Sequence, residues 1–178
     1  QMCKQEKAGS DRLDFERETP NKPDQQWTGE QFMRDYQNLA KVIASLCDGE
    51  NDVISKMATI SCELFHNVDG FDWVGFYRVV EPGLLKIGPY QGGHGCLVIP
   101  FDRGVCGACA KTEETQIVAD VDAFEGHIAC STSTKSEIVL PVFQNEELIA
   151  VLDIDSDTAN NFDERDQKAL EEILTAHF

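Results

Sequence analysis

The chain has 178 residues and a mass of 19.8 kDa, which suits one domain whose hydrophobic core needs no further staple. Its 32 acidic and 15 basic side chains give a formal net charge of −17, which disfavours binding to nucleic acids and to anionic membrane surfaces. The sequence contains no apolar run of the roughly 18 residues that a transmembrane helix requires and no signal-peptide pattern, so we expect a cytoplasmic protein.

Residues 1–27 are predicted to form a flexible N-terminal extension. This segment is polar, contains Pro20 and Pro23, and lacks the apolar periodicity of a helix or a strand. Residues 28–178 are predicted to form a single domain.

Helices are predicted on both sides of a block of strands. Thr28 and Gln31 have the spacing of a capping box, and the apolar residues behind them recur every three or four residues up to Leu46. Three further helices are predicted: one capped by Asp52, a short one over Val105 to about Lys111, and one that starts at Asp163.

Short apolar runs bounded by glycine, proline, asparagine and charged residues predict the strands. Six such runs are present: Trp73–Val80, Leu84–Ile87, Leu97–Ile99, Gln116–Val118, Glu137–Val142 and Leu148–Asp155. The order of elements predicts an α+β domain, with a central antiparallel sheet of about six strands and helices packed on it.

Seven cysteines are an odd number, which argues against a structural disulfide framework in a chain without a secretory signal. Cys47 and Cys62 lie in helix-like apolar patterns and are predicted to be buried as small hydrophobic residues. Cys3 lies in the polar extension and is assigned no role.

The other four cysteines, Cys96, Cys106, Cys109 and Cys130, lie in stretches that contain glycine. Thiols in such loops are exposed or movable more often than thiols in a core, so at least one is a candidate for reactivity. A zinc site formed by Cys106, Cys109, His127 and Cys130 is the alternative. It is disfavoured because a predicted strand separates the two pairs, and His94 and His127 are otherwise expected to be solvated loop residues.

Three carboxylates accompany the apolar strands near the end of the sequence. Asp153 and Asp155 are two residues apart on one strand, so their side chains share a face, and Glu137 opens another strand. If these strands are neighbours, the three carboxylates converge, and their mutual repulsion raises the proton affinity of at least one of them. The alternative is that they mark strand ends and face water.

Aromatic residues gather on the first predicted strand, which contains Trp73, Phe76 and Tyr77. They are interpreted either as ordinary core packing or as the apolar wall of a pocket for a small ligand.

The stretch from Trp73 to Ser156 resembles the free methionine-(R)-sulfoxide reductases, enzymes built on a GAF domain. The resemblance depends on the segments WVGFYRV, EGHIAC, SEIVLPV and VLDIDS and on the spacing of Cys96, Cys106 and Cys130. It extends more loosely over the predicted helices at 29–66 and 163–176. Cys109 lies outside the three-thiol pattern of the family.

The resemblance implies a role for each of the three matching thiols. Cys130 matches the cysteine that attacks the sulfoxide sulfur, and Cys96 matches the thiol that forms a disulfide with it. Cys106 matches a further thiol that can join this relay.

The resemblance also implies a substrate pocket. Glu137, Asp153 and Asp155 match its carboxylates, and Trp73 and Tyr77 match its aromatic walls. An acidic pocket suits a free amino acid, whose α-ammonium group is absent from a methionine inside a peptide.

The implied activity is reduction of free L-methionine-(R)-S-oxide through a cysteine sulfenic acid and an intramolecular disulfide, which a thioredoxin-like protein reduces. No cofactor or metal is expected, and backbone N–H groups of Ile128 and Ala129 are assigned to the substrate carboxylate. Family resemblance also makes a homodimer through the N-terminal helices plausible. The alternative is a non-catalytic GAF module that binds a small ligand such as a cyclic nucleotide, for which this acidic face is a poor match.

Overall fold

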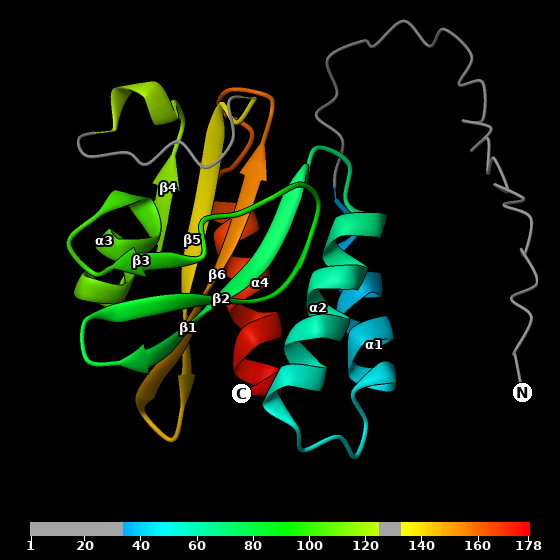
Figure 1. The fold of residues 1–178 in the computed structure, drawn as a ribbon. Helices are drawn as coiled ribbons and strands as arrows, with labels where there is room; N and C mark the ends of the chain where they lie inside the picture. Colours follow the sequence, from blue (N-terminus) through cyan, green and yellow to red (C-terminus); the bar gives the residue numbers. More distant parts are fainter. Residues whose placement is uncertain (1–33, 125–132) are drawn as a thin grey trace, which may run out of the picture. The chain divides into compact units, whose positions relative to one another are not determined.

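The structure, a computed structural model, describes residues 34–124 and 133–178. These residues form four α-helices, six β-strands and one short 3₁₀ helix (Figure 1). In chain order they are α1 (Tyr36–Leu46), α2 (Val53–Asn67), β1 (Trp73–Glu81), β2 (Leu84–Gln91), β3 (Val98–Pro100), α3 (Gly104–Thr112), β4 (Gln116–Val118), η1 (Val121–Ala123), β5 (Ser136–Gln144), β6 (Glu147–Ser156) and α4 (Glu164–His177).

The six strands form one sheet in the order β3-β2-β1-β6-β5-β4, and every neighbouring pair is antiparallel. The predicted α+β class and the antiparallel sheet are therefore confirmed. β5 and β6 are joined by a turn at Asn145 and Glu146, which both have positive φ values, of 53° and 67°. Such a turn matches the twist of the strands and helps to set their pairing.

The two faces of the sheet are covered by different helices. Alternate strand residues such as Phe76, Leu140 and Leu152 pack in one core with residues of α1, α2 and α4. The residues between them, such as Tyr77, Val139 and Val151, pack in a second core with α3. This division places the predicted pocket residues on the α3 side, because strand side chains alternate between faces.

The predicted helix that runs up to Leu46 is not continuous back to its predicted start. The capping box at Thr28 and Gln31 lies outside the described residues, as does the predicted extension, and Arg34 and Asp35 are not helical. The helix begins at Tyr36, and the Asp35 side chain accepts a hydrogen bond from the Asn38 N–H. Asp35 is thus the N-cap residue of α1, and the helical backbone begins directly after it.

The other predicted helices are confirmed with small changes at their ends. Asp52 caps α2 by accepting from the Ser55 N–H, and Asp163 and Asp166 form a capping box at the start of α4. Cys47 is buried as predicted, but Cys62 is only half-buried. It lies beside the buried stripe of α2 rather than within it.

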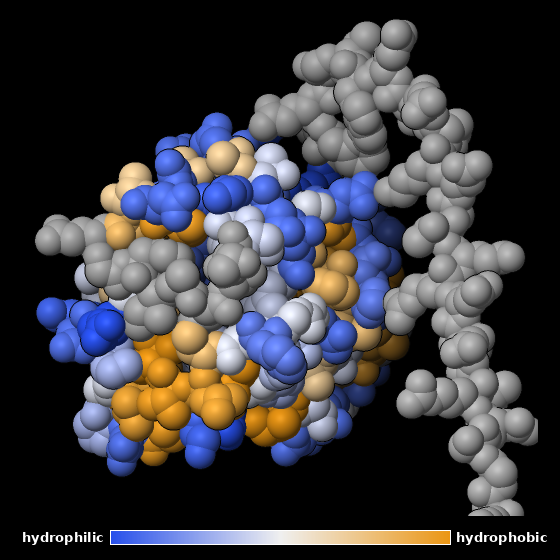
Figure 2. Space-filling view, turned by 45° about the horizontal axis from the view of Figure 1, so that its top comes forward, coloured by the Kyte–Doolittle hydropathy of each residue, from blue (hydrophilic) through white to orange (hydrophobic). Residues whose placement is uncertain are grey.

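The described helices include no segment with the length and apolar character needed to cross a membrane. Figure 2 shows a surface that is mostly hydrophilic, with hydrophobic side chains gathered in one area of the face in view. Exposed large hydrophobic residues include Leu97 and Val98, which lie beside Cys96 at the β3 edge of the sheet.

Candidate functional site

The pairing of three strands brings the predicted carboxylates onto one face. Glu137 of β5 lies opposite Asp155 of β6, and Asp155 in turn lies opposite Trp73 of β1. Asp153 lies two residues away on β6, opposite Gly75 and Val139. Opposite residues of an antiparallel pair point to the same side of the sheet. The three carboxylates therefore share the face that α3 covers.

Glu137 and Asp153 are buried, with 6% of each residue exposed, and Asp155 is half-buried. The alternative in which these acids face water is therefore wrong for Glu137 and Asp153. No lysine, arginine or histidine within residues 34–124 and 133–178 forms an ion pair with any of the three. The Asp153 Oδ1 atom is buried and has no hydrogen-bond partner among the described residues.

This environment favours the protonated form of each carboxyl group. Burial, followed by the charges of Asp153 and Asp155, raises the pKa of Glu137 well above its ordinary value. Burial raises the pKa of Asp153 to about 6, although hydrogen bonds with Cys106 and Glu137 lower it in part. Burial and then the charge of Asp153 raise the pKa of Asp155. The cluster therefore retains a proton near neutral pH and can act as an acid.

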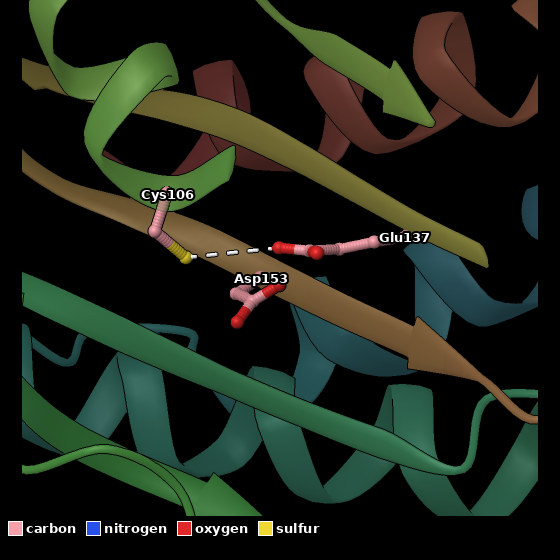
Figure 3. Close-up of side chains that lie close together, drawn as sticks. All are labelled: Cys106, Glu137 and Asp153. Atoms are coloured by element: carbon pink, nitrogen blue, oxygen red, sulfur yellow. Dashed lines mark hydrogen bonds between the residues drawn. The ribbon is translucent and has the colours of Figure 1, made fainter. Parts of the chain in front are cut away.

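α3 places Cys106 directly over this cluster (Figure 3). The Cys106 Sγ lies 4.0 Å from Glu137 Oε1, and burial together with the charges of Asp153 and Glu137 raises the pKa of the thiol. Cys109, one turn further along α3, is fully buried, and burial raises its pKa also. The expectation of exposed loop thiols is therefore wrong for Cys106 and Cys109.

A glycine explains how these thiols come to be buried. A Cβ atom on Gly107 would lie 2.4 Å from the Pro100 carbonyl oxygen, so only glycine lets α3 pack this closely against the end of β3. Gly107, which lies between the two cysteines, allows α3 to pack closely against the end of β3. From the sequence alone, the glycines near these cysteines indicate mobile loops.

The aromatic residues of β1 divide between the two faces. Phe76 packs in the core on the side of α1, α2 and α4, so for this residue the interpretation as core packing is correct. Trp73 and Tyr77 lie on the other side, with ring centroids 5.9 Å apart. Tyr77 packs in the same core as Cys106, where burial, and then the charges of Asp153 and Cys106, raise the pKa of its phenol.

Two features of the aromatic wall escape sequence reasoning. Tyr90 of β2 stacks on Trp73, with ring centroids 5.4 Å apart. Gly75 makes room for the Trp73 ring, because a Cβ atom there would lie 2.4 Å from Trp73 Cη2. The contact between Gly75 and Trp73 could have been predicted from the sequence, because residues two positions apart lie on the same face of a strand.

The segment that leads to Cys96 packs on the same wall. A Cβ atom on Gly95 would lie 2.8 Å from the Tyr77 hydroxyl and 3.0 Å from Trp73 Cζ2. Trp73 Nε1 donates a hydrogen bond to the Gly93 carbonyl oxygen at 3.2 Å. Cys96 is half-buried and disulfide-bonded, whereas Cys47, Cys62, Cys106 and Cys109 are free thiols.

Cys130, Ile128 and Ala129 lie outside the described residues, as does His127 of the zinc alternative. The structure describes the chain on both sides of this segment, where the Val121 N–H donates to the Lys135 carbonyl oxygen and the Lys135 N–H donates to that of Ser156. These two hydrogen bonds anchor the flanking residues at the end of the sheet where Glu137 and Asp155 lie.

Comparisons with known proteins agree with this geometry. Residues 51–176 match the family model described as GAF domain. The chain is 37% identical over 139 residues to the free methionine-R-sulfoxide reductase of Escherichia coli, a match that covers 78% of this chain and 84% of that protein.

Solved structures give the same result. The fRMsr of Staphylococcus aureus in its reduced form is 42% identical, with a TM-score of 0.78 over 81% of this chain and 93% of that one. The free methionine-R-sulfoxide reductase of Neisseria meningitidis in complex with its substrate is 40% identical, with a TM-score of 0.75 over 79% and 84% of the two chains.

Proposed function

Because the chain belongs to the GAF-domain family of free methionine-R-sulfoxide reductases, we propose that it reduces free L-methionine-(R)-S-oxide to L-methionine. The observation that carries this proposal is the buried cluster of Glu137, Asp153 and Asp155, which has no cationic partner among the described residues. A free amino acid supplies that missing cation as its α-ammonium group.

We assign the binding of the ammonium group to Asp153 and Asp155. A pKa of about 6 leaves Asp153 largely ionised at neutral pH. A methionine sulfoxide inside a peptide has no ammonium group and would leave these carboxylates buried and unpaired, a mismatch that can discriminate by about 10⁴-fold. Trp73 and Tyr77 offer an apolar wall for the methyl and methylene groups, and backbone N–H groups of Ile128 and Ala129 are proposed to bind the carboxylate.

Glu137 is assigned as the acid. Its carboxyl group favours the protonated form, because burial and the charges of Asp153 and Asp155 raise its pKa well above the ordinary value. A proton donated to the sulfoxide oxygen makes the sulfur a better electrophile, and an acid whose pKa is raised towards neutrality suits this task.

The thiol of Cys130 is proposed to attack the sulfur of the protonated sulfoxide. The oxygen passes to the cysteine, so that methionine leaves and Cys130 becomes a sulfenic acid. The Cys96 thiol then displaces this hydroxyl group as water and forms a disulfide. The disulfide at Cys96 and its position on the wall formed by Trp73 and Tyr77 support this order.

The cycle closes when an external dithiol, supplied by a thioredoxin-like protein, reduces the disulfide. Cys106 remains our proposed third thiol of the relay. Because Cys106 is buried and its thiol has a raised pKa, we expect it to react in thiol–disulfide exchange more slowly than Cys96. The thiolate is the reactive form of a cysteine.

The test of the proposed function measures the consumption of NADPH. The purified protein is incubated with thioredoxin, thioredoxin reductase and NADPH, and with the R or the S epimer of free or peptide-bound methionine sulfoxide. We expect NADPH to be consumed with the free R epimer, no turnover in Cys130→Ser, and one equivalent of methionine followed by arrest in Cys96→Ser. Cys62→Ser, a half-buried thiol on α2, is the matched control and should turn over normally. Steady-state activity in Cys130→Ser would refute the assignment of the nucleophile.

A further inference from the structure

Cys106, Glu137 and Asp153 form a compact group of potential metal ligands. One sulfur and two carboxylate oxygens, contributed by α3, β5 and β6, all lie within 4.8 Å of one another (Figure 3). All three residues are buried, and the Cys106 Sγ lies 4.0 Å from Glu137 Oε1. The group is therefore preassembled by three separate elements of the fold.

A second observation is that one oxygen atom of this group has no partner in the ranges that the structure describes. The Asp153 Oδ1 atom is buried and accepts no hydrogen bond within the described part of the chain. The Asp153 residue as a whole is only 6% exposed. A buried carboxylate oxygen without a partner costs free energy that a bound cation would recover.

The ligand types select the cation. Mg²⁺ and Ca²⁺ prefer six or more oxygen ligands, whereas one thiolate with two carboxylates suits Zn²⁺, which accepts sulfur and oxygen in a tetrahedral site. Zinc–ligand bonds of about 2.0–2.3 Å place the ligand atoms roughly 3.5 Å apart. The three atoms of this site need to approach one another by only about 1 Å to reach that geometry.

We propose that the reduced, substrate-free protein binds one Zn²⁺ ion between Cys106, Glu137 and Asp153, with a water molecule in the fourth position. The ion uses two of the carboxylates to which we assign roles in the reduction of methionine sulfoxide. It therefore competes with that substrate, and this second part of the inference rests on the proposed function. Zinc would hold the enzyme in an inactive form that a chelator reverses.

The test uses Co²⁺ as a spectroscopic probe, because a thiolate ligand gives Co²⁺ an intense charge-transfer band in the near ultraviolet. We expect the full-length reduced protein to develop this band with one equivalent of Co²⁺ and to lose it when Zn²⁺ is added. Cys106→Ser should abolish the band. Glu137→Gln and Asp153→Asn should weaken Co²⁺ binding at least about tenfold, a typical effect of disturbing a metal site.

Cys109→Ser is the matched control, since Cys109 is buried on the same helix but does not belong to the three-residue group. It should retain the band and the zinc affinity of the wild type. Absence of the band in the wild type, or its persistence in Cys106→Ser with loss in Cys96→Ser or Cys130→Ser, would overturn the proposal. Circular dichroism of each variant checks that a lost band does not reflect unfolding.

The two proposals fail separately. A protein that shows the Cys106-dependent band but does not reduce methionine sulfoxide has the zinc site without the proposed activity. A protein that reduces methionine sulfoxide but shows no such band has the activity without the zinc site. Competition itself requires that free methionine sulfoxide lowers the apparent zinc affinity and that EDTA restores full turnover to the zinc-treated enzyme.

Discussion

Asp153 is buried on a central strand of the sheet, where its carboxylate forms no ion pair with a cation of the described residues. The pattern of residues predicted that Asp153, Asp155 and Glu137 would converge if their strands were neighbours, but it left open whether they face water. Burial depends on which element covers that face. The cover is α3 with Cys106, and no local pattern around residue 153 contains this information.

The raised pKa of Asp153 makes a prediction about stability. Ionisation disfavours the folded state, and this penalty grows as the pH rises from the ordinary value of 3.8 to about 6. Asp153→Asn should therefore increase the free energy of unfolding by about 1 to 3 kcal/mol above pH 6 and bring little gain near pH 4. Urea unfolding at a series of pH values measures this difference.

Glu172→Gln is the control for that experiment, because Glu172 lies on the exposed side of α4. It should not change the pH dependence of unfolding. A destabilised Asp153→Asn at pH 7 would contradict the argument from burial. The same variant should bind free methionine sulfoxide more weakly.

Gly95 carries a second prediction at the level of single residues. Its missing side chain leaves space for the Tyr77 hydroxyl and the Trp73 ring, whereas a Cβ atom on Gly93 would contact nothing within 4 Å. Gly95→Ala should therefore displace Cys96 and slow disulfide formation several-fold, as followed by the loss of free thiols after one turnover. Gly93→Ala should leave this rate unchanged. Equal rates in the two variants would show that the contact at Gly95 does not position Cys96.

Among the elements, the strands and the helices capped by Asp52 and Asp163 could be predicted because their signals are local. Alternating apolar residues define a strand, and a capping aspartate defines the start of a helix. The start of α1 could not be predicted in this way. Arg34 contacts Asp166 at 2.8 Å, 132 positions later in the sequence, and its guanidinium lies 4.8 Å from the centre of the Phe71 ring. A local pattern of apolar residues contains no information about a contact between residues so far apart in the sequence, so it could not predict that Arg34 lies outside the helix.

This contact links α1 to α4, since Tyr36 of α1 also donates a hydrogen bond to Asp166. Arg34→Met removes the charge but retains the length of the side chain, so it leaves the Asp166 carboxylate buried without its cation. We expect a loss of about 2 to 4 kcal/mol in the free energy of unfolding, measured by urea denaturation. Arg165→Met breaks the exposed ion pair with Asp163 and should have little effect. Equal effects of the two substitutions would contradict this account.

In the molecule as a whole, the two faces of the sheet differ in the side chains that they carry. α1, α2 and α4 cover one face with an apolar core, whereas the other face carries the carboxylates, Trp73 and Tyr77 and is covered by α3 with Cys106. The alternation of strand residues and the family resemblance together predicted most of this second face. They did not predict that Cys106 and Cys109 are buried or that Tyr90 stacks on Trp73, because both depend on how α3 and β2 pack.

β6 contributes to both faces at once, with Leu152 and Ile154 on one side and Asp153 and Asp155 on the other. A one-residue slip in its pairing would exchange these two sets, because the side chains of a strand alternate. Variation in length among descendants of this sequence is therefore expected to accumulate in the connecting segments, while β6 tolerates neither a gained nor a lost residue between Leu152 and Asp155.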